Sequence, residues 1–127
     1  MDAYKTQGAF SWNELVTTDP AASAAFYGEL LGWSVKEMGP EMGGYRVVSV
    51  GETAVGGIMA VPPDAPPGMP PHWGSYVTVD DVDRTLARGA ALGAKTLLPP
   101  MDVPGVGRMA VLQDPQGAVI HLITYAG

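Results

Sequence analysis

The sequence predicts an α+β fold in which a single domain of 127 residues is built from two tandem β-α-β-β-β modules. The main observation is an internal repeat. At a constant offset of 61, residues 73–94 match residues 12–33 at seven of 22 positions, where about one or two matches are expected by chance. The second observation is size, because a module of about 60 residues is marginal alone. The modules, residues 9–61 and 73–125, are therefore expected to share a core or a sheet.

The first module begins with an alternating strand over residues 10–18. Asp19 and Pro20 then provide an N-cap carboxylate and a proline at the first helical position, and Gly32 ends the helix. The buried stripe predicted for this helix consists of Ala22, Ala25, Phe26, Tyr27 and Leu30. The three remaining strands are predicted at residues 33–38, 45–50 and 53–60.

The second module repeats this order after a proline-rich linker at residues 62–72. Asp80 is predicted to precede a helix over residues 81–92, and Leu92 matches Leu31 as a core position of the paired helices. The last hairpin turn is predicted at residues 114–117, Asp-Pro-Gln-Gly. The strands of this module are expected at residues 73–79, 95–98, 108–113 and 118–125.

Composition excludes several classes of function. The formal net charge is -6 and the seven basic residues are scattered, so no nucleic-acid partner is expected. There are no cysteines, which excludes disulfides, thiolate metal sites and a cysteine nucleophile. No apolar run approaches the roughly 20 residues of a membrane span, and the polar first residues do not form a signal peptide. We expect a cytoplasmic protein with no membrane partner.

The sequence around the first helix and the last turn resembles the vicinal oxygen chelate superfamily, which includes glyoxalases, bleomycin resistance proteins and dioxygenases. The resemblance rests on Asp19, Phe26-Tyr27 and Leu31-Gly32-Trp33, and on residues 114–117. It covers residues 9–125, and residues 10–33 look most like uncharacterised actinobacterial glyoxalase-like members. It implies a curled eight-stranded mixed sheet around a cleft, with the helices outside, a small organic ligand and a homodimer.

The resemblance also places four metal-ligand positions in this chain. They fall on Trp12, Gly57, Gly74 (Trp73 if the repeat offset holds strictly) and His121. A divalent ion needs two or three donors, and among these positions His121 alone has one. A protein without a metal cofactor is therefore expected. The alternative is one divalent metal ion bound by His121 with two displaced donors, Glu14 and His72.

Strand alternation from these positions predicts which side chains line the cleft. The cleft set is Trp12, Glu14, Val55, Gly57, Met59, Gly74, Tyr76, His121 and Ile123. Leu15, Ile58, Val77 and Leu122 are expected to face the helices. The residues predicted to bind a ligand are Trp12, Glu14, Met59, Tyr76 and His121.

Within this set, Trp12 and Tyr76 are candidates for stacking on a planar ligand. Glu14 is the candidate polar anchor or proton-transfer group, because a carboxylate on an apolar strand is costly unless it is paired or used. A purely structural ion pair is the other interpretation, and the partners expected for Glu14 are Arg46, Arg108 or His121.

Three functions remain open from the sequence. The first is a metal-independent protein that binds an aromatic or apolar organic molecule in its cleft. The second is a metal-dependent lyase, isomerase or dioxygenase that uses His121 with displaced donors. The third is a dimeric interaction subunit without catalysis, since sheet edges attract a partner. The ligand is not predictable, because its pocket depends on the loops at residues 39–44 and 100–107.

Overall fold

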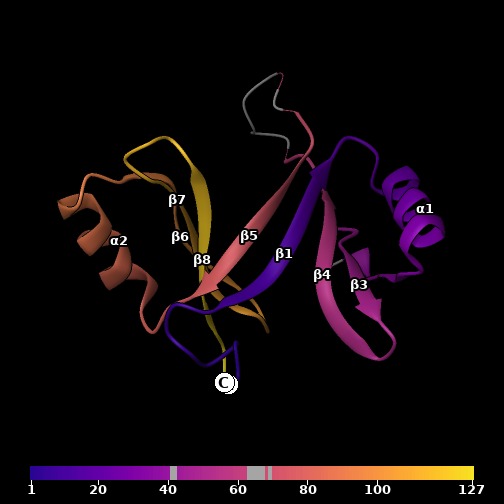
Figure 1. The fold of residues 1–127 in the computed structure, drawn as a ribbon, viewed down its shortest axis with the longest axis horizontal. Helices are drawn as coiled ribbons and strands as arrows, with labels where there is room; N and C mark the ends of the chain where they lie inside the picture. Colours follow the sequence, from indigo (N-terminus) through magenta and orange to yellow (C-terminus); the bar gives the residue numbers. More distant parts are fainter. Residues whose placement is uncertain (41–42, 63–67, 69) are drawn as a thin grey trace. The chain divides into compact units, whose positions relative to one another are not determined.

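The computed structural model describes residues 1–40, 43–62, 68 and 70–127 (Figure 1). The predicted order of elements, β-α-β-β-β twice, is confirmed. The first set comprises β1 (Phe10–Thr17), α1 (Pro20–Leu31), β2 (Ser34–Glu37), β3 (Arg46–Val50) and β4 (Thr53–Ala60). The second comprises β5 (His72–Thr78), α2 (Val82–Ala91), β6 (Lys95–Val103), β7 (Gly107–Gln113) and β8 (Val119–Tyr125). Of the predicted linker at residues 62–72, residues 63–67 and 69 lie outside the described residues.

The eight strands follow the order β2-β3-β4-β1-β5-β8-β7-β6. β1 pairs with β4, and β5 with β8, in parallel. The hairpin neighbours β2–β3, β3–β4, β6–β7 and β7–β8 pair antiparallel. The sheet is therefore mixed and not closed, as the predicted α+β fold requires. Neither helix in the described part of the chain is long and apolar enough to cross a membrane.

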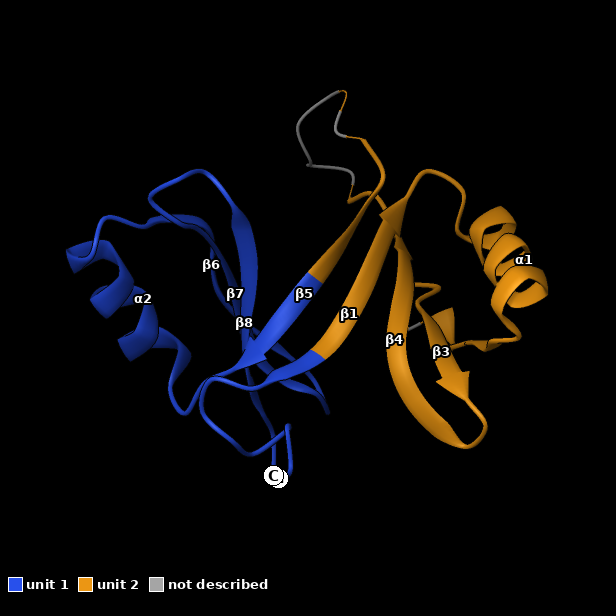
Figure 2. Cartoon of the chain, viewed as in Figure 1, with its two compact units in different colours: residues 1–11, 75–127 blue, residues 12–74 orange. Residues whose placement is uncertain are grey.

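The chain divides into two compact units, which Figure 2 shows in different colours. Unit 2 contains residues 12–74, and unit 1 contains residues 1–11 and 75–127. The N-terminal residues belong to unit 1 because they form hydrogen bonds with Thr78. The N–H of Gly8 donates to the carbonyl of Thr78, and the N–H of Thr78 donates to the carbonyl of Ala9, both at 2.8 Å. These contact units differ from the sequence modules 9–61 and 73–125, which remain a proposal about duplication.

The core of unit 2 lies between its strands and α1. Leu15 and Ile58 are partners in the parallel β1–β4 register and are 4% and 0% exposed. Val48 completes this buried cluster, and Tyr27 and Trp33 pack against it. The predicted cap of α1 is confirmed, since Asp19 Oδ1 accepts from the N–H of Ala22 at 3.0 Å. The helix ends at Gly32, whose φ of 74° is left-handed.

The buried stripe predicted for α1 is wrong. Tyr27 alone of the predicted set is half-buried, and Ala22, Ala25, Phe26 and Leu30 are exposed. The side of the helix that is less exposed carries Ser23, Ala24, Tyr27 and Gly28. The sequence PAASAAFYGELL is apolar on nearly every side, so its periodicity does not indicate which side faces the sheet. The outer side of α1 is consequently apolar.

Helix α2 of unit 1 shows the opposite pattern, with apolar residues inward and charged residues outward. Val82 and Leu86 pack with Val79, Ala110 and Leu122 in the core of this unit. The predicted helix start is wrong by one residue, because the side chain of Asp81, and not Asp80, caps the helix through the N–H of Arg84 at 3.0 Å.

The predicted core roles of Leu31 and Leu92 are both wrong. Leu31 is the last residue of α1 and Leu92 directly follows α2, and each stands before a glycine with positive φ, Gly32 and Gly93. Leu92 is 62% exposed, and its match Leu31 is 52% exposed.

Strand β6 is longer than predicted and runs through Pro99 and Pro100 to Val103. It is the last strand of the sheet order, where one side has no ladder to bond. Proline is tolerated on such an edge because it lacks only a donor that the edge does not use. The pairing with β7 shifts register between Leu98 and Met101, around the two prolines. The loop predicted at residues 100–107 is therefore shorter than expected.

The predicted turn at residues 114–117 is confirmed, with Asp114 Oδ1 accepting from Ala118 N at 3.0 Å.

These burials predict a contrast between two substitutions. Ile58→Ala should lower the free energy of unfolding by about 2 to 5 kcal/mol, because it leaves a cavity in the closed core under α1. Leu92→Ala should cost less than about 1 kcal/mol, since its side chain is already largely in water. Urea unfolding followed by circular dichroism measures both. Equal losses would contradict the packing described for the two units.

Candidate functional site

The face of the unit 2 sheet opposite α1 carries the residues predicted on β1 and β4. Leu15 and Ile58 point toward α1, so strand alternation directs their neighbours to the other face. Glu14 pairs with Gly57, and Val16 pairs with Met59, in the β1–β4 register. The predicted side-chain directions of Trp12, Glu14 and Met59 follow from this register.

A chain of two hydrogen bonds connects the polar groups on this face. Trp12 Nε1–H donates to the hydroxyl of Tyr45 at 3.0 Å. The same hydroxyl donates to Glu14 Oε2 at 2.7 Å, a short bond typical of a carboxylate acceptor. All three side chains are half-buried. Tyr45 thus holds the indole and the carboxylate in fixed positions.

Gly57 makes room for Tyr45. A Cβ at Gly57 would overlap the hydroxyl and the ring of Tyr45. Gly57 is also one of the positions that the family resemblance assigned to a metal ligand, and here the phenol of Tyr45 lies against it. Sequence reasoning missed Tyr45 because it lies just before β3 with no motif around it. The one available signal was a glycine in the middle of a strand, which often marks the close approach of another group.

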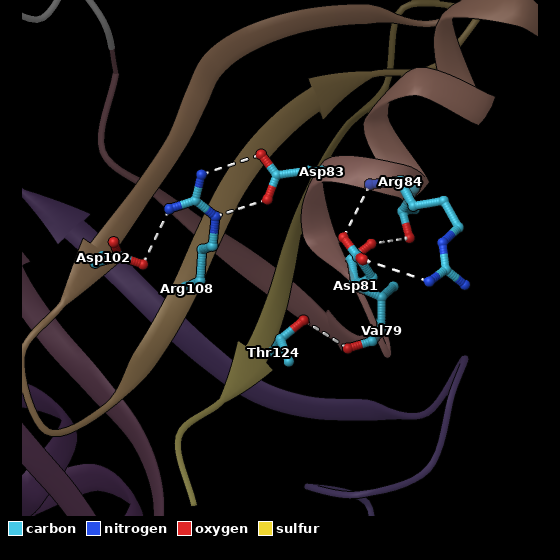
Figure 3. Close-up of polar contacts among 8 residues, drawn as sticks. Val79, Asp81, Asp83, Arg84, Asp102, Arg108 and Thr124 are labelled. Carbon is cyan, nitrogen blue, oxygen red and sulfur yellow. Dashed lines mark hydrogen bonds and ion pairs between the residues drawn. The ribbon is translucent and has the colours of Figure 1, made fainter.

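Two of the three partners expected for Glu14 bind other carboxylates. Arg46 Nη2 lies 3.2 Å from Glu37 Oε2. Arg108 donates from Nε and Nη2 to the two carboxylate oxygens of Asp83, at 2.7 and 3.0 Å (Figure 3). The prediction that Arg46 or Arg108 pairs with Glu14 is therefore wrong. The hydroxyl of Tyr45 donates to the carboxylate of Glu14.

The Arg108 network connects α2 to β6 and β7 within unit 1. Arg108 Nη1 also donates to Asp102 Oδ1 at 3.0 Å, so one guanidinium joins two carboxylates (Figure 3). The hydrogen bonds from Arg108 lower the pKa of Asp83, and the two carboxylates raise the pKa of Arg108. These groups are largely in water, so the network orients α2 rather than forming a reactive site.

Two further predicted ligand residues contact each other in unit 1. Tyr76 and His121 are partners in the β5–β8 register, and their rings stack with centroids 4.5 Å apart and planes at 16°. Tyr76 is 6% exposed. One face of the tyrosine ring is thus covered by the imidazole, which restricts the surface it offers to a ligand.

The donors of the alternative metal site are distributed over the two units. Glu14 and His72 belong to unit 2, whereas His121 belongs to unit 1. His72 Nδ1 lies 3.0 Å from the carbonyl of Pro70. Among the residues that the structure describes, no group of three His, Cys, Asp or Glu side chains is placed to hold a metal ion.

Unit 2 also contains an aromatic groove on the α1 side of the sheet, with a volume of about 400 Å³. Its lining residues are Asn13, Trp33, Val48, Val55, Gly56 and Trp73. Trp33 stacks on Tyr27 with centroids 5.5 Å apart, and Trp73 Nε1–H donates to the hydroxyl of Tyr27 at 3.2 Å. Trp73 is 41% exposed.

Val55 was predicted on the cleft face but lines this groove. In the β3–β4 pairing Val48 lies opposite Gly56 and Ser49 opposite Ala54, so Val55 is the extra residue of a bulge. A bulge redirects the side chains on its strand. Periodicity in the sequence counts residues at a constant step of two, and it therefore cannot locate such an insertion.

A model of the "Glyoxalase/Bleomycin resistance protein/Dioxygenase superfamily" matches residues 9–122. The chain belongs to this superfamily. The resemblance inferred from the helix and turn residues is thereby confirmed, and the observed order of strands and helices agrees with it.

Curated relatives come from two groups of bacteria. The protein named "Putative glyoxylase CFP32" from Mycobacterium tuberculosis is 44% identical over 117 residues, which cover 91% of this chain and 44% of that protein. "Anthracycline biosynthesis protein DnrV" from Streptomyces peucetius is 37% identical over 123 residues, 87% of this chain and 45% of that protein. The chain thus spans less than half the length of these relatives.

Solved structures share the fold at low sequence identity. Methylmalonyl-CoA epimerase from Mycobacterium tuberculosis has a TM-score of 0.69 and 17% identity, covering 97% of this chain and 92% of that one. A variant of homoprotocatechuate 2,3-dioxygenase from B. fuscum has a TM-score of 0.65 and 21% identity, covering 93% and 32%. These similarities establish the fold of this chain. Its chemistry has to be argued from its own residues.

The contact between Gly57 and Tyr45 predicts the effect of one added methyl group. Gly57→Ala should displace the phenol of Tyr45 and so break its hydrogen bonds to Trp12 and Glu14, at a cost of about 1 to 3 kcal/mol in unfolding free energy. Urea unfolding measures the loss, and the indole Nε1–H resonance of Trp12 reports the broken bond. The same methyl added by Gly117→Ala meets no atoms but is strained by its positive φ, so it controls for stability loss without a change at Trp12. An unchanged Trp12 resonance in Gly57→Ala would contradict the described contact.

Proposed function

We propose that this chain binds a small aromatic or apolar organic molecule, without a metal cofactor, on the face of unit 2 that carries Trp12 and Glu14. The observation that carries the proposal is the hydrogen-bond chain from Trp12 through Tyr45 to Glu14. An indole held by its Nε1–H presents a rigid flat surface for stacking. The carboxylate and hydroxyl beside it supply the few polar groups that fix a ligand's orientation in an otherwise apolar site.

The chemistry of these groups narrows the class of ligand. A carboxylate in a half-buried position favours a ligand with a positive charge or a hydrogen-bond donor near its ring. Met59 lies on the same face and has the flexible thioether side chain that adapts to ligands of varied shape. Tyr76 and His121, whose rings stack on each other within unit 1, remain candidate ligand residues of that unit.

The relatives give independent support for a planar ligand. Two of them, from Streptomyces peucetius and Streptomyces sp., are named for anthracycline biosynthesis. Anthracyclines contain fused, planar rings, which is the shape that an indole surface stacks on. We therefore propose a fused-ring aromatic compound that carries an amine or another donor as the class of ligand.

One observation favours an enzyme as the alternative function. The mycobacterial relatives, at 44% identity, are named "Putative glyoxylase CFP32". The corresponding proposal is a metal-dependent lyase, isomerase or dioxygenase in which His121 binds one divalent ion together with displaced donors. Glu14 and His72 are the donors proposed for it. Metal content distinguishes this alternative from the first proposal.

The proposal predicts the metal content and the response to a chelator. Protein purified without added metal should contain less than about 0.1 equivalent of Ni, Zn, Fe or Mn, because Trp12, Gly57 and Gly74 offer no donor. Its melting temperature should be the same with and without EDTA. One equivalent of bound metal and a large drop in melting temperature with EDTA would favour the enzyme, and His121→Ala should then abolish that metal.

The ligand site is tested by calorimetric titration with two probes, an amino-substituted anthraquinone and neutral anthraquinone. Trp12→Ala should abolish binding of both probes, because the stacking surface is lost. Glu14→Gln should weaken the amino-substituted probe by about tenfold to a hundredfold and spare the neutral one. These variants must retain the wild-type circular dichroism spectrum.

Trp73→Ala is the matched control, since it removes an indole from the aromatic groove on the other face of unit 2. Its affinity for both probes should equal that of the wild type. If Trp73→Ala abolishes binding and Trp12→Ala does not, the ligand occupies the aromatic groove and the proposed site is wrong. If neither probe binds the wild type at millimolar concentration, the proposed class of ligand is wrong.

A further inference from the structure

The aromatic groove of unit 2 has two indole walls that stand nearly at a right angle. Trp33 and Trp73 both line the groove, with ring centroids 5.8 Å apart and planes at 80°. Tyr27 completes the cluster, because it stacks on Trp33 and lies at 78° to Trp73 with centroids 5.4 Å apart. Two of the three tryptophans in the chain are therefore gathered at one groove.

The two indoles are held in place although part of their surface is open. Trp73 is 41% exposed, and its Nε1–H donates to the hydroxyl of Tyr27 at 3.2 Å. Trp33 is half-buried and packs against the core cluster of unit 2 as well as on the ring of Tyr27. A ring surface that is already oriented costs a ligand less free energy to bind than one that must first be ordered.

The charge of the surroundings selects among ligands. None of the groove's lining residues in the described part of the chain is charged, and Asn13 is the one lining residue with an amide side chain. An anion would lose its hydration, meet the negative faces of the rings and be repelled by the net charge of -6. A primary ammonium is strongly hydrated and would find no carboxylate among these lining residues. A quaternary ammonium, whose charge is surrounded by methyl groups, is attracted to indole faces without that loss.

The angle between the walls selects the shape of the ligand. A flat ring that stacks on one indole cannot also stack on the other, because their planes differ by 80°. A rounded group can contact both walls at once. We propose that the aromatic groove binds a quaternary ammonium group, such as the trimethylammonium group of a choline-type molecule, through cation–π contacts with Trp33 and Trp73.

This site goes beyond the proposed function and does not rest on it. The ligand site proposed at Trp12 and Glu14 lies on the opposite face of the unit 2 sheet, and a flat molecule is proposed for it. The groove has a volume of about 400 Å³, within the range of small-molecule sites. Because cation–π contacts at a partly open site are individually weak, we expect a dissociation constant of about 1 mM for choline.

A nuclear magnetic resonance titration of the wild-type protein tests the proposal with two probes of the same shape. Choline carries the positive charge, and 3,3-dimethylbutan-1-ol is its uncharged counterpart. Choline should shift the indole Nε1–H resonances of Trp33 and Trp73 saturably, and the alcohol should bind at least about tenfold more weakly, because it lacks the charge that the rings attract. Equal affinity for the two probes overturns the proposal, as do the same shifts with sodium chloride at equal concentration.

Substitutions then locate the choline site. Trp73→Leu keeps an apolar side chain but removes the ring, and it should weaken choline binding by at least about tenfold, whereas Trp73→Phe should lose less than about fivefold because a ring face remains. Trp12→Ala is the matched control, since it removes an indole from the opposite face of unit 2, and it should leave the affinity for choline unchanged. Full retention in Trp73→Leu, or a loss confined to Trp12→Ala, overturns the proposal. The comparison of the two probes on the wild-type protein does not depend on how these variants fold.

Discussion

The parallel register of β1 with β4 is the constraint on which the candidate site depends. It pairs Leu15 with Ile58 and Glu14 with Gly57. Since side chains alternate along a strand, the first pair closes the core under α1 and the second lies on the opposite face. A slip of one residue would bury the carboxylate of Glu14 under the helix, so the free energy of the apolar core fixes the position of the polar site. The β5–β8 register does the same for Leu122 and His121.

Gly57 then determines what this face of unit 2 contains. Without a Cβ at that position the phenol of Tyr45 lies against the strand and bonds to both Trp12 and Glu14. A side chain that would bring a donor to a metal ion is thus replaced by space for an aromatic ring. The outcome is an arrangement of indole, hydroxyl and carboxylate joined by two hydrogen bonds, and the proposed recognition of a flat organic molecule rests on it.

The two helices show how one architecture supports two different surfaces. α2 is held by an apolar side inward and by the bond of Arg108 to Asp83 at its outer edge. α1 contributes only half-buried residues to its core and leaves Phe26 and Leu30 in solvent. The two sets of elements therefore share their order, while the outer sides of their helices differ.

The sequence by itself determined the family, the order of elements, the cap at Asp19 and the faces of Leu15 and Glu14, because each depends on short-range spacing and periodicity. It did not determine which side of α1 is buried, since a helix that is apolar all round has no periodic signal. It also missed the one-residue change in offset that moved the cap to Asp81, and it placed Leu31 and Leu92 in the core although both are exposed. The partner of Glu14 and the lining of the aromatic groove were decided only by tertiary structure. Tyr45 lies 31 residues from Glu14 and Trp73 lies 46 residues from Tyr27, and contacts over such separations depend on strand register and on the bulge at Val55, which local sequence does not encode.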